Sequence, residues 1–192
     1  MTSLARAERL RLVAAARAAG EDAPTLCEGW TTRDLATHLV IREREPVAAM
    51  GIMVPAFEGR LEDKERDYAS MPYSELLGLV AAPPKWTPGA WPGVGSVMNT
   101  TEYLVHHEDI RRAELEWFPR RLSRKDNATV WAQARFALLP YAAKAKGRTV
   151  IVSPGFGTHA AGRGETTTVT GEPVEVLLWL LGRTDHALVD VR

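Results

Sequence analysis

Apolar residues recur at the three- and four-residue spacing of helices in four long stretches of the chain. The first stretch ends at Gly20, a residue type that often follows the last turn of a helix. The second begins with Thr31 and Asp34 at the spacing of a capping box, in which each side chain binds the other residue's backbone N–H. The pattern therefore predicts a mainly α protein with long helices over residues 3–19, 31–42, 99–113 and 126–146.

The C-terminal segment has a different pattern. Residues 148–152 and 166–170 are rich in Val, Ile and Thr, which favours strands, and a glycine-rich link joins them. Pro173 stands where a final apolar helix would begin, and Gly182 where it would end. We therefore predict a helical domain over residues 1–147 and a small α+β domain over residues 148–192.

Residues 51–98 are the least regular part of the chain. Residues 58–68 are strongly charged and indicate a solvated helix or loop, and residues 74–80 resemble a short capped helix. Trp86 and Trp91 stand among prolines and glycines, a composition typical of loops. Such an aromatic loop fits the mouth of a pocket, and it fits equally well a loop pinned to the surface of the helices.

Composition narrows the class of partner. The chain of 192 residues has 24 Lys and Arg against 24 Asp and Glu, so its formal net charge is zero. A neutral chain argues against a nucleic acid or an anionic membrane as the main partner. No apolar run approaches the roughly 18 residues of a membrane span, and arginines interrupt the N-terminal segment where a signal peptide would be apolar. We therefore expect a cytoplasmic protein.

Polar side chains interrupt the apolar stripe of the helix predicted over residues 99–113. Glu102, His106 and Asp109 fall on one face at helical spacing, whereas His107 and Glu108 point the other way. A carboxylate and an imidazole four residues apart lie on neighbouring turns, so both can reach one metal ion. An alternative remains open, because Asn99 and Glu102 also have the spacing of a helix N-cap and its partner.

A third candidate ligand strengthens the metal hypothesis. His38 lies in the middle of the apolar stripe of the helix that Thr31 opens, between Leu35 and Ile41. Two helices that each place a ligand side chain in the core are typical of metal sites in helical bundles. The residues therefore predict a site of His38, Glu102 and His106 that leaves at least one coordination position open.

Several further residues are candidates around this site. Arg42 falls one turn beyond His38 and could anchor an anion, although it could equally belong to an exposed charge cluster. Asp109 could orient His106 or act as a catalytic base facing the open position. Cys27 is the single cysteine and is interpreted as a small packing residue rather than a ligand or nucleophile. His159 and His186 lack partner spacing and are left outside the site.

The motif W-T-x-x-D-L-x-x-H-L at residues 30–39, followed by E-x-x-x-H at 102–106, resembles the DinB-like metal-binding proteins. The branch that it resembles is the actinobacterial mycothiol-dependent maleylpyruvate isomerase-like proteins, and residues 169–183 are similar to the end of that family's C-terminal domain. The resemblance implies an up-down four-helix bundle with a small α+β C-terminal appendage. It places the family's metal triad on His38, Glu102 and His106, whereas nothing in residues 51–95 identifies the isomerase's substrate pocket.

Two functions of different classes follow. The first is an enzyme that depends on a divalent metal, with Zn²⁺ as the expected ion, and that uses mycothiol as a cosubstrate in the isomerisation or S-transfer of a small molecule. Arg42 and Asp109 are then the catalytic candidates. The second is a non-catalytic metal-binding or small-molecule-binding module, which a closed site with Asp109 as a fourth ligand would favour. The sequence does not specify an oligomeric state.

Overall fold

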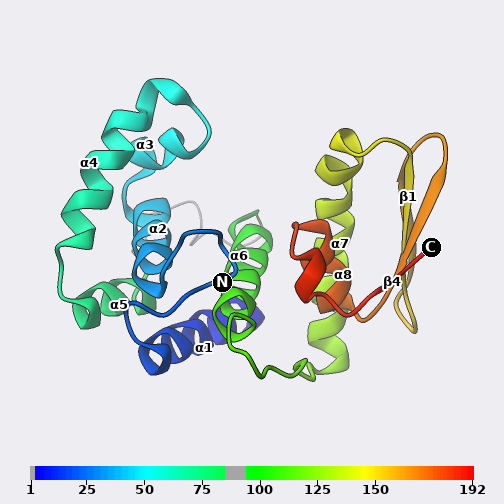
Figure 1. The fold of residues 1–192 in the computed structure, drawn as a ribbon, viewed down its shortest axis with the longest axis horizontal. Coiled ribbons are helices and arrows are strands. Elements are labelled where there is room, and N and C mark those ends of the chain that lie inside the picture. The colour runs from blue at the N-terminus through cyan, green and yellow to red at the C-terminus, as the bar shows by residue number, and fades with distance from the viewer. Residues whose placement is uncertain (1–2, 85–93) are drawn as a thin grey trace. The chain divides into compact units, whose positions relative to one another are not determined.

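The computed structural model describes residues 3–84 and 94–192, which form two compact units, residues 1–118 and 119–192 (Figure 1). The first unit is helical, and the second combines helices with a four-stranded sheet. The prediction of a mainly α protein with a small sheet is confirmed. Trp86 and Trp91, the tryptophans of the predicted aromatic loop, lie outside the described residues.

The first unit is built from helices that run in both directions around one apolar core (Figure 1). Its helices are α1 (Ser3–Ala19), α2 (Thr32–Arg44), α3 (Pro46–Ala49), η1 (Met50–Ile52), η2 (Pro55–Phe57), α4 (Glu58–Ala69), α5 (Tyr73–Ala81) and α6 (Val94–Arg111). The core side chains come from α1, α2, α5 and α6, and they include Leu12, Leu39, Leu76 and Ile110. This core places α2 and α6 in one packed unit.

Local sequence explains where α1 and α2 begin and end. Gly20 follows α1 with φ +90°, a left-handed conformation that only glycine adopts without strain, and its N–H binds the Ala16 carbonyl at 3.1 Å. At the start of α2, Thr31 Oγ1 accepts a hydrogen bond from the Asp34 N–H, and Asp34 Oδ2 accepts one from the Thr31 N–H. The predicted capping box is therefore confirmed.

The second unit packs two helices with a sheet. Its elements are α7 (Arg124–Lys144), β1 (Arg148–Ser153), β2 (Gly157–Gly162), β3 (Thr166–Thr170), α8 (Pro173–Leu180), η4 (Thr184–His186) and β4 (Asp190–Val191). The strand order is β2-β1-β3-β4, with β1 parallel to β3 and the other pairs antiparallel. Every residue of α8 is buried, and α8 packs mainly on α7. The helix α7 therefore shares the core of this unit.

Two predictions about this region differ from the structure. The glycine-rich link was expected only to join two strands, but six of its residues form the strand β2, because pairing along the whole of β1 outweighs the weak strand preference of glycine and alanine. The predicted boundary at residue 147 also differs from the division at residue 118. The helix predicted as the fourth of the bundle is α7, whose residues Val130, Ala134 and Leu138 are buried in the second unit.

The role of α7 leads to a prediction about fragments. A fragment of residues 148–192 lacks α7 and leaves the apolar helix α8 without its main packing partner. We expect this fragment to show no cooperative thermal transition by circular dichroism, because without α7 both α8 and the sheet lose their main packing partner, and a small sheet with little packed against it is only marginally stable. The fragment of residues 119–192 includes α7 and should unfold cooperatively. Equal behaviour of the two fragments would contradict this account.

Within the described residues, none of the helices combines the length and the apolar character that crossing a bilayer requires.

Candidate metal site

Helices α2 and α6 bring three side chains of the first unit together. Glu102 Oε1 lies 3.1 Å from His38 Nε2 and 3.4 Å from His106 Nε2. The three side chains are partly buried, with exposed fractions of 18% for His38, 22% for Glu102 and 13% for His106. These ligand atoms all lie within 4.8 Å of one another. The structure thus brings together the three residues that the sequence predicted as a metal site, which we call the triad.

The start of α6 answers the question left open about Glu102. The helix begins at Val94, so Asn99 is an interior residue and cannot be its N-cap. Asn99 is buried, and its Oδ1 accepts a hydrogen bond from Arg42 at 3.1 Å. Arg42 Nε also lies 3.5 Å from Glu102 Oε1. Arg42 is therefore directed towards the triad and is not part of an exposed charge cluster.

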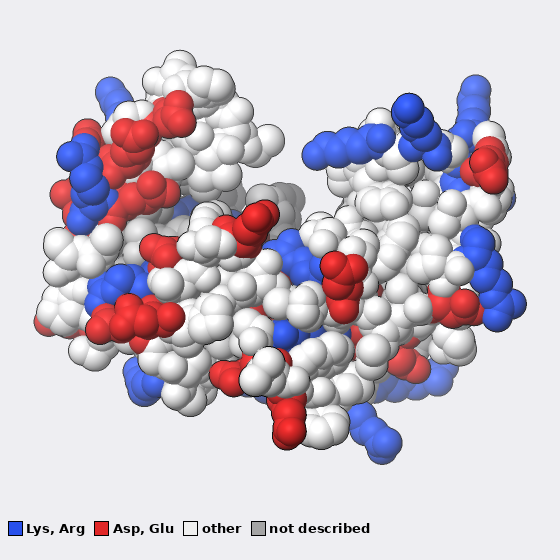
Figure 2. All heavy atoms as spheres, in the orientation of Figure 1, with Lys and Arg blue, Asp and Glu red and all other residues white. Residues whose placement is uncertain are grey.

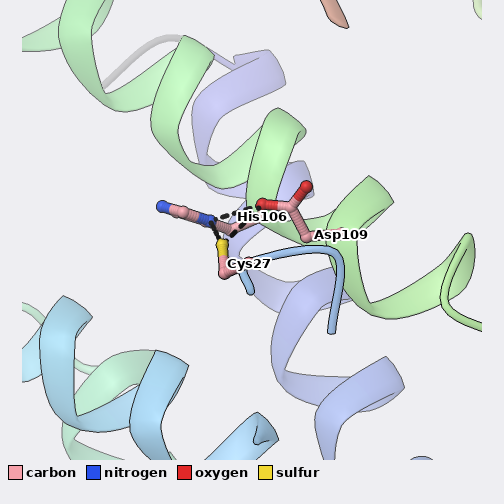
Figure 3. Close-up of side chains that lie close together, drawn as sticks. All are labelled: Cys27, His106 and Asp109. Carbon is pink, nitrogen blue, oxygen red and sulfur yellow. Dashed lines mark hydrogen bonds and ion pairs between the residues drawn. The ribbon is translucent and has the colours of Figure 1, made fainter. Parts of the chain in front are cut away.

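The other ring nitrogen of His106 faces a second group (Figure 3). His106 Nδ1 lies 2.8 Å from Asp109 Oδ2, and Asp109 is completely buried. A histidine that uses one ring nitrogen for a metal commonly donates the other N–H to a carboxylate, which fixes its tautomer and orientation. Asp109 is on the Nδ1 side of the ring, whereas the triad meets at Nε2. This geometry suits an orienting carboxylate better than a fourth ligand.

Cys27 lies beside His106 and Asp109 (Figure 3), a position that the sequence did not indicate. Its Sγ lies 3.3 Å from Asp109 Oδ2 and 3.9 Å from His106 Nδ1. The loop before α2 holds it there, because the Leu26 N–H binds the Asp109 carbonyl at 3.0 Å. Cys27 also packs against the apolar core, as predicted. Only its position in the sequence, just before the helix of His38, could have suggested a place near the site.

His107 and Glu108 point away from the triad, but they are buried and not part of a solvated face. His107 Nδ1 lies 2.9 Å from Glu8 Oε2 on α1, and Arg112 donates a hydrogen bond to Glu108 at 2.7 Å. The sequence placed both residues on the face opposite the triad, and the structure shows that this face is also buried, with α1 packed on α6. A helix enclosed on both sides must pair the polar groups on each of its faces.

Two pKa shifts describe the charges at the triad. Burial alone would raise the pKa of Glu102, but hydrogen bonds from His106 and His38 and the charge of Arg42 outweigh it and hold the pKa well below its usual range. Burial alone would lower the pKa of His106. The hydrogen bonds to Asp109, Cys27 and Glu102 outweigh that effect and raise the pKa of His106 well above 6.5. Without a metal, the site is therefore a charge-paired cluster.

These shifts predict the pH dependence of the metal-free chain. Glu102 contributes stability above its unfolded pKa of 4.5, and this contribution is lost as pH falls through its lower folded pKa. His106 contributes stability below its unfolded pKa of 6.5, and this contribution is lost as pH rises through its higher folded pKa. We expect the urea concentration at the unfolding midpoint of chelator-treated protein to decrease as pH rises above 6.5. His106→Gln should flatten this part of the profile, and an unchanged slope would contradict the assignment.

The fold and the site define a class of protein: a helical unit with a His-Glu-His triad on two helices, followed by a unit with a small sheet. Comparison with known proteins shows which family the N-terminal region resembles. Residues 3–72 match the model of the mycothiol maleylpyruvate isomerase N-terminal domain. No curated protein matches the chain by sequence. The matched residues include His38 and Arg42 and end before α6.

Two solved structures are similar to the whole chain. They are crystal structures of the mycothiol-dependent maleylpyruvate isomerase and of a histidine-to-alanine mutant of it. Each is 15% identical and covers 98% of this chain and 90% of the other, with TM-scores of 0.64 for the former and 0.66 for the mutant. The resemblance predicted from the motifs is therefore confirmed, by sequence in the N-terminal region and by fold over nearly the whole chain.

Proposed function

We propose that this protein is a divalent-metal-dependent enzyme that uses a low-molecular-weight thiol, mycothiol, in the isomerisation or S-transfer of a small molecule. The observation that carries the proposal is the meeting of His38 Nε2, His106 Nε2 and Glu102 Oε1 at distances of 3.1 and 3.4 Å. The family of the N-terminal region supports the choice of thiol.

The distances fit a metal ion. Ligand atoms bonded to Zn²⁺ at about 2.0–2.1 Å in a tetrahedral site lie roughly 3.3 Å from one another. Both separations from Glu102 Oε1 are close to this value. Two imidazoles and one carboxylate are also a donor set that binds Zn²⁺ in catalytic sites, with another position left for substrate or water. His38, Glu102 and His106 would therefore hold the ion.

The ion would lower the pKa of a bound thiol or water and stabilise negative charge that develops on a substrate oxygen. The residues around it have separate roles. Asp109 accepts the His106 Nδ1–H and keeps Nε2 directed at the triad. Arg42 adjoins Glu102, so its guanidinium can bind a carboxylate of the substrate or of the thiol cosubstrate.

The alternative of a non-catalytic module predicts a closed site with Asp109 as a fourth ligand. Asp109 lies on the opposite side of the His106 ring from the other two triad residues. This geometry supports an open site and hence the enzyme.

The test is a titration of mycothiol into Co²⁺-substituted protein, in which the sulfur-to-cobalt charge-transfer absorption is monitored. We expect a new band on addition of mycothiol, because a thiolate is a good ligand for the open position. The experiment should use Cys27→Ser, since Cys27 Sγ lies 3.9 Å from His106 and its own thiolate could produce a band. His106→Ala should abolish the response. Saturating mycothiol without a spectral change, in protein with one Co²⁺ per chain, would favour the binding module.

A further inference from the structure

A cavity of about 540 Å³ lies between α2 and α4 and adjoins the triad. Asp34, Thr37 and His38 form one wall at helical spacing, and the facing wall is a single face of α4. The volume is in the range of small-molecule sites. His38 belongs both to this cavity and to the triad, so a molecule bound here can contact one residue of the proposed metal site.

The charge of the cavity walls is negative. Asp34, Glu62 and Glu65 supply three carboxylates, and Arg66 supplies one guanidinium. The guanidinium of Arg66 is paired with Asp63 on its own helix. Figure 2 shows acidic side chains gathered along α4, with basic ones between them. The walls therefore attract a cation and repel a compound with several carboxylates.

Two neutral side chains complete the cavity. Trp30 lines it, with its ring centroid 5.2 Å from that of His38. Thr37 is 4% exposed, and within the described part of the chain its Oγ1 has no hydrogen-bond partner. An indole face attracts cations, and a hydroxyl oxygen accepts a hydrogen bond from an ammonium group. The aromatic wall, the carboxylates and the hydroxyl acceptor thus all favour a ligand that carries an ammonium group.

We propose that this cavity binds the ammonium group of a small molecule whose other end reaches His38. The proposal rests on the proposed function in one respect, because it names the substrate class of the same site. The relatives are named for maleylpyruvate, a compound with carboxylates. Such a compound would face Glu62 and Glu65 here, and Arg42 is not among the described residues that line the cavity. The ammonium preference therefore distinguishes this chain from an enzyme for dicarboxylates.

The test uses three four-carbon probes that differ in charge: 1,4-diaminobutane, 1,4-butanediol and succinate. Each is titrated at low ionic strength into metal-free protein without any thiol, so the outcome is independent of the metal and thiol experiments. The readout is the indole N–H resonance of Trp30, assigned among the six tryptophans by its absence in Trp30→Phe. We expect saturable shifts with 1,4-diaminobutane, a weaker response with the diol, and none with succinate.

Two charge-matched variants locate the binding. Glu62→Gln/Glu65→Gln should weaken the binding of 1,4-diaminobutane roughly five- to tenfold, as expected for two partly solvated ion pairs. Glu58→Gln/Asp67→Asn removes the same charge from α4 at positions that do not line the cavity. This control variant should change the affinity for 1,4-diaminobutane less than twofold. Succinate binding equal to that of the diamine, no response to the diamine, or equal effects of the two variants would each overturn the proposal.

Discussion

Replacing His106 by alanine is expected to remove the metal from the purified protein. The wild-type chain should hold about one divalent ion, and the variant should bind it roughly 100-fold more weakly or worse, because a ligand is lost outright. Asp109→Asn should have a smaller effect, roughly 10- to 100-fold, since it disturbs the orientation of His106 and removes no ligand of the triad. Elemental analysis and competition with a chelator of known affinity measure both effects.

His107→Ala is the control for this experiment, because it removes a neighbouring imidazole that faces α1. The variant should keep its metal. It should lose roughly 1–3 kcal/mol of stability, since Glu8 then loses a hydrogen-bond partner inside the protein. Unchanged metal content in His38→Ala, Glu102→Ala and His106→Ala alike would rule out the triad as a metal site.

Of the substitutions proposed for this chain, Arg9→Leu is expected to lower the free energy of unfolding the most. Arg9 is 1% exposed, and its guanidinium pairs with Glu43 on α2 and Tyr103 on α6. It also donates to the Val80 carbonyl at 2.5 Å. Without Arg9, the Glu43 carboxylate stays buried without its cation, which costs about 3–5 kcal/mol in comparable pairs. Urea unfolding measures the difference in unfolding free energy.

The matched control is Arg6→Leu, the same substitution at an exposed position of α1. It should change the unfolding free energy by no more than about 0.5 kcal/mol. The Arg9 variant should also bind metal more weakly, because Glu43 and Tyr103 join the helices that carry His38 and Glu102. Equal stabilities for the two variants would show that the buried ion pair contributes little to the fold.

Structural features that depend only on residues close together in the chain could be predicted from the sequence. The periodicity of α1, α2 and α7, the capping box of Thr31 and Asp34, and the glycine after α1 depend on residues close together in the chain. The placement of His38, Glu102 and His106 on inward faces has the same origin, since helical phase follows from residue spacing. The sequence therefore determined the four long helices α1, α2, α6 and α7, their inner faces and the candidate ligands.

Features that depend on pairing between distant segments were decided only by the tertiary structure. The packing of α7 on α8 moved the division of the chain to residue 118, and pairing with β1 made a strand of the glycine-rich link. The contact of α1 with α6 buried His107 beside Glu8, and the docked loop brought Cys27 to Asp109. The cavity likewise exists only because α2 faces α4. Spacing along a chain determines which face a side chain occupies, but the partner of that face is set by the packing of the whole molecule.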